Sequence, residues 1–184
     1  SAASVRPEQS PRMTGPSSTV VVTLHLRDGG VRPEYAKHGD AGADLASIED
    51  LVLGPGARAL VRTGVAVAVP TGYVGLVNPR SGLAARHGVG IVNAPGTIDS
   101  GYRGEILVNL VNLWSEEVAI LRGDRIAQLL IMPVVQAEFS PVDSLPDSDR
   151  GETGHGSSGG FAAASNAAPP PSSPGTEDPR PQRG

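Results

Sequence analysis

Asp99 lies in a stretch whose composition is typical of a broad β-hairpin tip. Strand-like apolar segments at residues 90–93 and 106–113 flank it, and turn-forming residues at 94–96 and 99–101 fill the space between them. An aspartate before Ser-Gly often closes an Asx turn through its own side chain. The local sequence therefore leaves both a structural and a chemical role open for this carboxylate.

Two other stretches have the chemistry of an anion site. Arg80 and Ser81 stand at the start of a short predicted helix, 81–87, whose free N–H groups favour an anion; an ordinary Ser81 N-cap beside a solvated arginine is the alternative. The glycine-rich stretch 150–160 supplies backbone amides, hydroxyls and Arg150, which suit a polyphosphate, although a flexible linker has the same composition. It lacks the Gly-Lys-Ser/Thr ending of a P-loop, so that motif is excluded.

Two further polar residues stand out. Gln128 interrupts the apolar segment 126–135, and because a buried unpaired amide costs about 1–3 kcal/mol, it either satisfies backbone groups or faces a wet site. Asp44, taken alone, is most often a turn acid. The 4 histidines show no metal-ligand spacing, and the zinc deaminase signature is absent.

The elements that must position these residues are short β-branched runs separated by Gly, Pro and Asp. Such runs at close spacing predict an all-β fold, a jelly-roll-like distorted barrel with one short helix that Gly88 ends. Aromatic residues make up only 3% of the chain, so the core must consist mainly of Val, Leu, Ile and Ala. The predicted strands are 19–26, 51–53, 58–69, 73–77, 89–92, 106–113, 118–121 and 126–135.

Composition divides the 184 residues into four segments. Residues 1–18 and 162–184 are rich in Pro and Ser and have no apolar periodicity, so we expect both to be disordered. Residues 19–142 form the predicted β domain, and 143–161 a flexible glycine-rich arm.

Charge and composition exclude several classes of function. The net charge is −4 with no stripe of Lys and Arg, so we expect no nucleic-acid partner. The longest apolar run is far shorter than the roughly 20 residues of a spanning helix, so we expect no membrane partner. The chain has no cysteine, so nothing points to an oxidising compartment and we expect a cytoplasmic location.

Taken together, five motifs in this order resemble those of the homotrimeric dUTPases, and the resemblance covers residues 20–161. The Ala/Gly/Val-rich composition and the His-Gly-Ser-Ser-Gly-Gly ending resemble an actinobacterial member. The motifs are Ala41-Gly42-Ala43-Asp44-Leu45, Pro79-Arg80-Ser81-Gly82-Leu83, Gly96-Thr97-Ile98-Asp99-Ser100-Gly101-Tyr102-Arg103-Gly104-Glu105, Gly123-Asp124-Arg125-Ile126-Ala127-Gln128 and Arg150-Gly151-x-x-Gly154-x-Gly156-Ser157-Ser158-Gly159.

The resemblance implies a jelly-roll homotrimer with shared active sites that hydrolyses dUTP to dUMP and pyrophosphate with Mg²⁺. It implies that Asp99 is the general base for the attacking water and that Tyr102 packs under the deoxyribose, leaving no room for a 2′-hydroxyl. The uracil edge would pair with Asn93 and with the hairpin backbone around Gly96, Thr97 and Ile98.

For the triphosphate, the resemblance implies that Asp44 holds the hydration shell of Mg²⁺. The α- and β-phosphates would be bound by Arg80, Ser81, Gly82 and Gln128. From the arm, Arg150, Ser157 and Ser158 would close on the γ-phosphate, and Gly156 would also contact the substrate. His155, at a position more often Phe in the family, would lie over the uracil.

Two alternatives remain at this stage. A dCTP deaminase, or a bifunctional deaminase and dUTPase, shares the jelly-roll trimer but uses a Glu in the hairpin region and lacks the Gly-Tyr-Arg-Gly pattern. A non-catalytic jelly-roll binding module is permitted by the fold alone.

Overall fold

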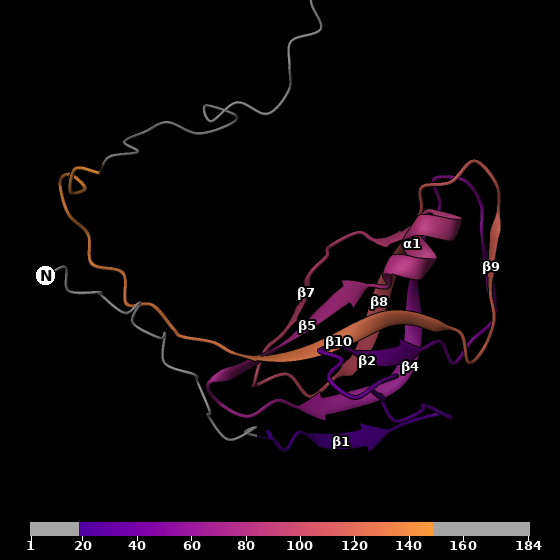
Figure 1. Cartoon of the computed structure of the whole chain (residues 1–184), viewed down its shortest axis with the longest axis horizontal. Coiled ribbons are helices and arrows are strands. Elements are labelled where there is room, and N and C mark those ends of the chain that lie inside the picture. The colour runs from indigo at the N-terminus through magenta and orange to yellow at the C-terminus, as the bar shows by residue number, and fades with distance from the viewer. Residues whose placement is uncertain (1–18, 149–184) are drawn as a thin grey trace, which may run out of the picture. The chain divides into compact units, whose positions relative to one another are not determined.

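The computed structural model describes residues 19–148, and within them the fold is almost entirely β (Figure 1). The elements are β1 (Thr23–Leu26), β2 (Ala43–Ala46), β3 (Leu51–Leu53), β4 (Arg58–Ala68), β5 (Tyr73–Pro79), α1 (Ser81–His87), β6 (Val89–Ile91), β7 (Gly96–Ile98), β8 (Glu105–Asn112), β9 (Val118–Ile120) and β10 (Arg125–Pro133). This confirms the predicted all-β class with one short helix.

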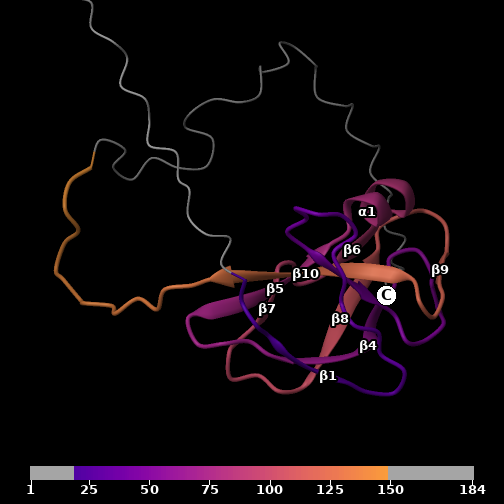
Figure 2. The same cartoon turned by 60° about the horizontal axis from the view of Figure 1, so that its bottom comes forward.

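Two four-stranded antiparallel sheets form the body of the fold, in the jelly-roll arrangement that the sequence predicts. One has the strand order β1-β4-β8-β6 and the other β2-β10-β5-β7, while β3 and β9 form a separate two-stranded sheet. Figure 2 shows the two larger sheets from a second direction, and in both views α1 and β1 lie on opposite sides of the fold.

The core lies between the sheets and follows from side-chain alternation. In β8, Ile106, Val108 and Leu110 point inward and are at most 1% exposed, while the residues between them face outward. Asn112 ends this inward row, and its amide is fully paired with the carbonyls of Leu53 and Glu116 and with the amide of Trp114. A buried polar side chain therefore ties the β3–β9 sheet to the core without an unsatisfied group.

The helix has the bounds that the sequence predicts, Ser81–His87, but its N-cap is a different residue. Arg80, with extended backbone, is the N-cap, and its carbonyl accepts from the amides of Leu83 and Ala84 at 3.0 Å. The prediction that Ser81 caps the helix is wrong, because the chain passes directly from β5 into the first turn. The predicted end at Gly88 is confirmed, and its amide donates to the carbonyl of Ala84.

The predicted hairpin spans both sheets. β6 and β8 pair as expected, with Val89 opposite Asn112, but the broad tip contains a strand of its own, β7, which pairs with β5 in the other sheet. β2 is a second strand that the sequence did not predict, because Ala43–Ala46 is short and was interpreted as a turn. Both missed strands carry site residues.

The compact unit of strands ends at Ala137, and residues 138–148 contain no helix or strand. The predicted boundary at residue 142 and the disordered segments stay predictions, and most of the arm lies outside the described residues. No helix in the described part of the chain is long and apolar enough to cross a membrane.

Candidate active site

Asp99 follows β7 and presents an exposed carboxylate. The turn after it is closed by the backbone, with the amide of Tyr102 donating to the carbonyl of Asp99 at 3.0 Å. None of the residues in 19–148 donates a hydrogen bond to the Asp99 carboxylate, so the Asx-turn interpretation is wrong. A hollow of about 210 Å³ opens beside it, lined by both of these residues and by Thr97, Ile98, Glu105, Ile106 and Leu107.

The ring of Tyr102 is held against the backbone of the same hairpin. Its hydroxyl donates to the carbonyl of Glu105 at 2.9 Å, and the ring lies directly over Gly104. A Cβ at Gly104 would stand 2.5 Å from Cζ of that ring, so only glycine leaves room for it. Tyr102 is 42% exposed and lines the wall of the hollow.

Glu105 anchors this hairpin to β4. Its carboxylate accepts from Arg62 Nη2 at 3.0 Å and from the amide of Gly64 at 2.8 Å, and Arg62 also pairs with Asp28. Burial raises the pKa of Glu105, but the hydrogen bonds from Arg62 and Gly64 outweigh it, so this pKa lies below its ordinary 4.5. The same guanidinium lowers the pKa of Asp28. The start of β8 is thus fixed by charge-assisted hydrogen bonds.

A second set of site residues forms a row across β2, β10 and β5. Asp44 is opposite Gln128, which is opposite Asn78, so the three side chains share one face of the sheet. Gln128 makes no side-chain hydrogen bond within the described residues, and a Cβ at Gly42 would stand 2.6 Å from its Oε1. Of the two interpretations of Gln128, the structure therefore favours a side chain facing an open site.

Asp44 joins two arginines, and we call Asp44, Arg80 and Arg125 the arginine cluster. Arg80 Nε donates to Asp44 Oδ1 at 2.8 Å, and Arg125 Nη1 donates to Oδ2 at 3.0 Å. Arg80 Nη1 also donates to the carbonyl of Arg125 at 3.2 Å. One carboxylate between two guanidiniums leaves a net positive charge, which suits an anion.

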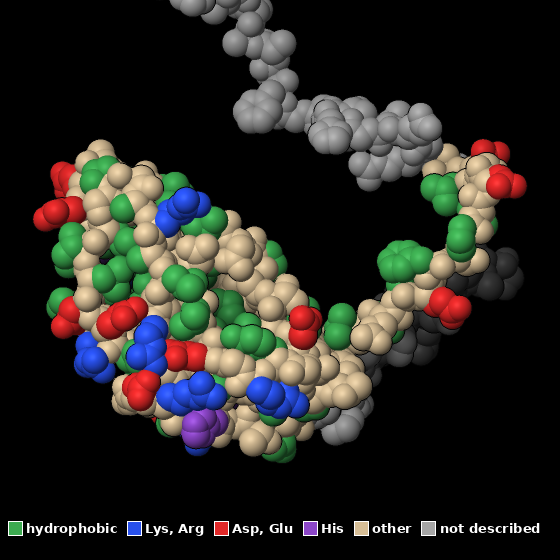
Figure 3. All heavy atoms as spheres, turned by 180° about the vertical axis from the view of Figure 1, so that it is seen from behind, with side chains coloured by type: hydrophobic (Ala, Val, Ile, Leu, Met, Phe, Trp, Pro, Cys, Tyr) green, Lys and Arg blue, Asp and Glu red, His purple; other side chains and the backbone are tan. Residues whose placement is uncertain are grey.

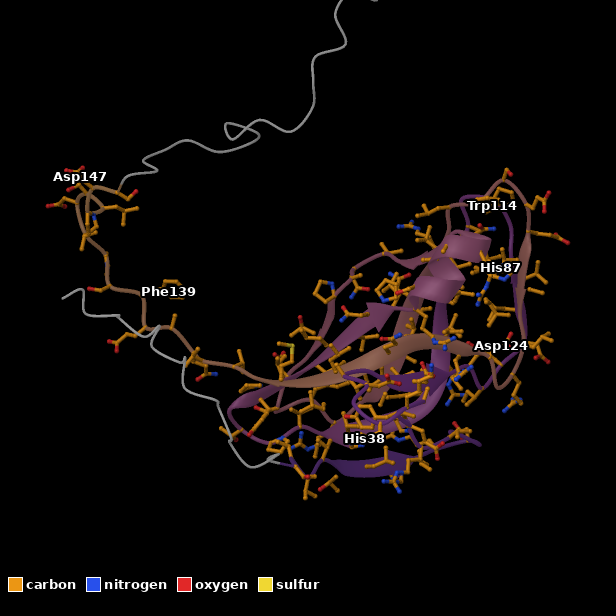
Figure 4. All side chains as sticks on the ribbon, viewed as in Figure 1. His38, His87, Trp114, Asp124, Phe139 and Asp147 are labelled. Atoms are coloured by element: carbon orange, nitrogen blue, oxygen red, sulfur yellow. The ribbon has the colours of Figure 1, made fainter. Side chains whose placement is uncertain are left out.

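The cluster borders a hollow of about 440 Å³ between α1 and the start of β10. His87 and Asp124, labelled in Figure 4, lie on its two sides, at the end of α1 and in the turn before β10. Ser81 and Gly82 are in the first turn of the same helix, directly after Arg80. Of the predicted phosphate residues, Arg80 lines this hollow, while Asp44 pairs with Arg80 and lies opposite Gln128 in the sheet.

The hairpin residues and the arginine cluster lie far apart within one chain. Ile98 is opposite Gly75 on β5, which places Asp99 level with Val74, whereas Arg80 follows the other end of that strand. Six residues of strand separate these levels, about 20 Å at roughly 3.3 Å per residue. One copy of the chain therefore does not bring its own Asp99 to its own Arg80.

Asn93 and Gly96 lie between these groups, near Val77. The predicted arm residues lie outside the described residues; they are Arg150, His155, Gly156, Ser157 and Ser158. Sequence reasoning did not single out Asn78 or Arg125. Arg125 lies inside a quoted motif, but Asn78 gave no signal, because its placement depends on strand register.

Comparisons with known proteins show the family of the chain. A family model described as dUTPase matches residues 30–159. The protein called deoxyuridine 5'-triphosphate nucleotidohydrolase of Cutibacterium acnes is 63% identical over 128 residues, which cover 69% of this chain and 84% of that one. The protein of the same name from Mycobacterium tuberculosis is 57% identical over 152 residues, 79% of this chain and 99% of that one.

Solved structures give the same result. Staphylococcus bacteriophage 80alpha dUTPase with dUpNHpp has a TM-score of 0.72 and 33% identity, over 77% of this chain and 99% of that one. A mutant dUTPase of phage phi11 of S. aureus, whose structure reveals the coordination of a structural Mg(II) ion, has a TM-score of 0.65 and 29% identity, over 70% of this chain and 100% of that one. With two thirds of its length matched by the family model, this chain belongs to the dUTPase family.

Proposed function

We propose that this chain hydrolyses dUTP to dUMP and pyrophosphate. The observation that carries the proposal is the free, exposed carboxylate of Asp99 beside Tyr102 in the hairpin hollow. Because no residue in 19–148 donates a hydrogen bond to this carboxylate, it is available to a water molecule. The close actinobacterial relatives named for this reaction support the same assignment.

In the proposed reaction, Asp99 accepts a proton from the water that attacks the α-phosphorus. A new P–O bond forms to that water, the bond to the oxygen bridging the α- and β-phosphorus breaks, and pyrophosphate leaves. A positioned carboxylate base contributes about 10²- to 10⁴-fold to such a step.

Sugar and base selection are assigned to the hairpin. The ring of Tyr102, fixed by its hydroxyl and by Gly104, forms the floor for a deoxyribose and excludes a 2′-hydroxyl by contact. The exposed side chain of Asn93 and the backbone of β7 pair with the uracil edge. Because the hairpin lies close to the uracil edge, it leaves no room for a methyl or amino substituent on the base.

Phosphate binding is assigned to the arginine cluster with Ser81, Gly82 and Gln128. Mg²⁺ bound to the triphosphate supplies charge neutralisation, and such an ion needs few protein ligands because it keeps several waters. Within residues 19–148 no group of three or more acidic or His side chains forms a metal cage. Asp44, with both oxygens engaged by arginine, fits an outer contact through water rather than direct coordination.

We infer that the active site is shared between chains of a homotrimer. The 20 Å offset along β5 supports this, because a second copy must supply either Asp99 or the arginine cluster. The outer face of the β1-β4-β8-β6 sheet supports it too: Leu60, Val92 and Leu107 are 59%, 44% and 42% exposed there, and Figure 3 shows hydrophobic side chains exposed between charged ones. Light scattering should give three times the chain mass.

The test of the reaction is pyrophosphate release with Mg²⁺, run on dUTP beside dCTP, dTTP and UTP. Release from dUTP alone is the expected result. Ammonia release from dCTP would favour the deaminase, and no turnover of any substrate would favour the non-catalytic binding module. The arm residues and the cytoplasmic location stay predictions.

A further inference from the structure

We propose that Arg125 is a positioning residue for the phosphate-binding Arg80, which it holds through Asp44 and through its own backbone carbonyl. The inference rests on the proposed function, since it assigns a new role within the same site. Arg125 itself is not required to touch the substrate.

A local irregularity in β10 aims Arg125 at Asp44. The pairing of β10 with β2 places Gln128 opposite Asp44 and Ala127 opposite Leu45, but Arg125, not Ile126, opposite Ala46. In a regular ladder Arg125 would point to the other face of the sheet, because side chains alternate. The extra residue reverses this, and bulges of this kind often re-aim a side chain next to an active site.

The consequence for Arg80 follows from its donors. A guanidinium has five N–H groups. One on Nε and one on Nη2 face Asp44, at 2.8 Å and 3.5 Å, and one on Nη1 is taken by the carbonyl of Arg125 at 3.2 Å. The side chain is thus held from two directions and keeps two N–H groups for an anion. Without the side chain of Arg125, Asp44 would lose one of the two guanidiniums that fix its carboxylate, and Arg80 would be oriented less firmly.

The charge of Arg125 favours phosphate binding in addition to the orientation of Arg80. Asp44 is only 12% exposed and would be neutralised by Arg80 alone, whereas a second guanidinium leaves the arginine cluster with a net charge of +1. The Arg125 side chain is 55% exposed, so its ion pair adds little to the stability of the fold. Its loss should therefore weaken phosphate binding without unfolding the protein.

The experiment compares Arg125→Ala with Arg122→Ala, a matched control that removes an equal charge from the same turn. Arg122 is exposed, and its side chain makes no ion pair or hydrogen bond within residues 19–148. Calorimetry measures binding of inorganic pyrophosphate with Mg²⁺ and of dUpNHpp, kinetics give KM and kcat for dUTP, and thermal melting checks the fold.

We expect Arg125→Ala to weaken both ligands and to raise KM about tenfold, with kcat and the melting temperature near those of Arg122→Ala. Both variants keep the backbone carbonyl, but Arg125→Lys also keeps a cation beside Asp44 and should retain most of the affinity. In a double-mutant cycle with Arg80→Lys, the effect of Arg125→Ala should largely disappear, because it acts through Arg80.

The inference would be overturned if Arg125→Ala bound both ligands as tightly as Arg122→Ala does. It would also be overturned if Arg125→Lys lost as much ligand affinity as Arg125→Ala. Affinity losses of Arg125→Ala that add fully to those of Arg80→Lys would overturn it too, because they would mean a direct contact of Arg125 with phosphate. Failure of the proposed function is distinguishable, because wild-type protein would then release no pyrophosphate from dUTP. Even then, pyrophosphate binding would test the positioning role of Arg125. If wild-type protein bound no pyrophosphate, that role would be overturned.

Discussion

Substituting Gly104 by alanine tests how the hairpin selects the sugar. The new Cβ would stand 2.5 Å from Cζ and 3.0 Å from Cε2 of Tyr102, in addition to overlapping its hydroxyl oxygen. The ring cannot stay where it is, because real Cβ contacts are never so short. It must leave its present position at the wall of the hollow, where it is assigned to contact the deoxyribose.

The magnitude follows from what the ring loses. The hydrogen bond from Tyr102 to the carbonyl of Glu105 is worth about 0.5–1.5 kcal/mol, and forcing the ring back against a methyl group costs about 1–3 kcal/mol. Together these give about 1.5–4.5 kcal/mol, a loss of roughly tenfold to 2,000-fold in kcat/KM for dUTP. UTP should lose less, because the contact that excludes its 2′-hydroxyl is gone.

The assay is kcat/KM for dUTP and UTP, with Gly101→Ala as the control. Gly101 belongs to the same turn, but a Cβ there has no neighbour within 4 Å, so both activities should stay near wild type. The expected result is a lower dUTP-to-UTP ratio for Gly104→Ala only. An unchanged ratio in that variant would refute the role of the fixed tyrosine ring in sugar selection.

Three further outcomes are expected. Asp99→Asn should bind dUpNHpp normally but lower kcat by about 10²-fold or more, and full turnover would remove Asp99 as the base. Glu105→Gln should lower the free energy of unfolding, measured by urea titration, by about 1 kcal/mol at neutral pH. Because the folded-state pKa of Glu105 is depressed, the difference between variant and wild type should vanish as the pH falls from 4.5 through that pKa. A difference that stays constant with pH would contradict this prediction. Asn112→Ala should lower the free energy of unfolding by about 2–4 kcal/mol, because three hydrogen bonds of its buried amide are lost. Asn109→Ala, which faces outward on the same strand, should lower it by less than about 0.5 kcal/mol. Equal losses in urea unfolding would contradict the role given to the buried amide.

The sequence predicted the fold class, the helix and its end at Gly88, and the hairpin that carries Asp99. It did so because β-branched runs and turn residues are local signals. β2 and β7 were missed, since three or four residues rich in Gly, Ala and Thr show no strand pattern by themselves. They become strands only because β10 and β5 offer partners.

The site was predictable to the same extent. Motif residues such as Arg80, Gln128 and Asp44 could be named from the resemblance, but their distances could not. Arg125 faces Asp44 because of one irregular pairing in β10, and no residue type in this segment predicts that irregularity. The distance between Asp99 and Arg80 depends on strand order, which becomes visible only when the sheets are assembled.

The separation of the two groups along β5 also bears on how this enzyme tolerates damage. If each site takes Asp99 from one copy and Arg80 from another, a chain with a defective hairpin disables a single site of the trimer. A chain whose fold is disturbed along β5 displaces both its Asp99 and its Arg80, and therefore disables the two sites to which they belong. Variants in this central strand should for that reason act dominantly in mixed assemblies, whereas variants at either end should be partly masked by normal copies.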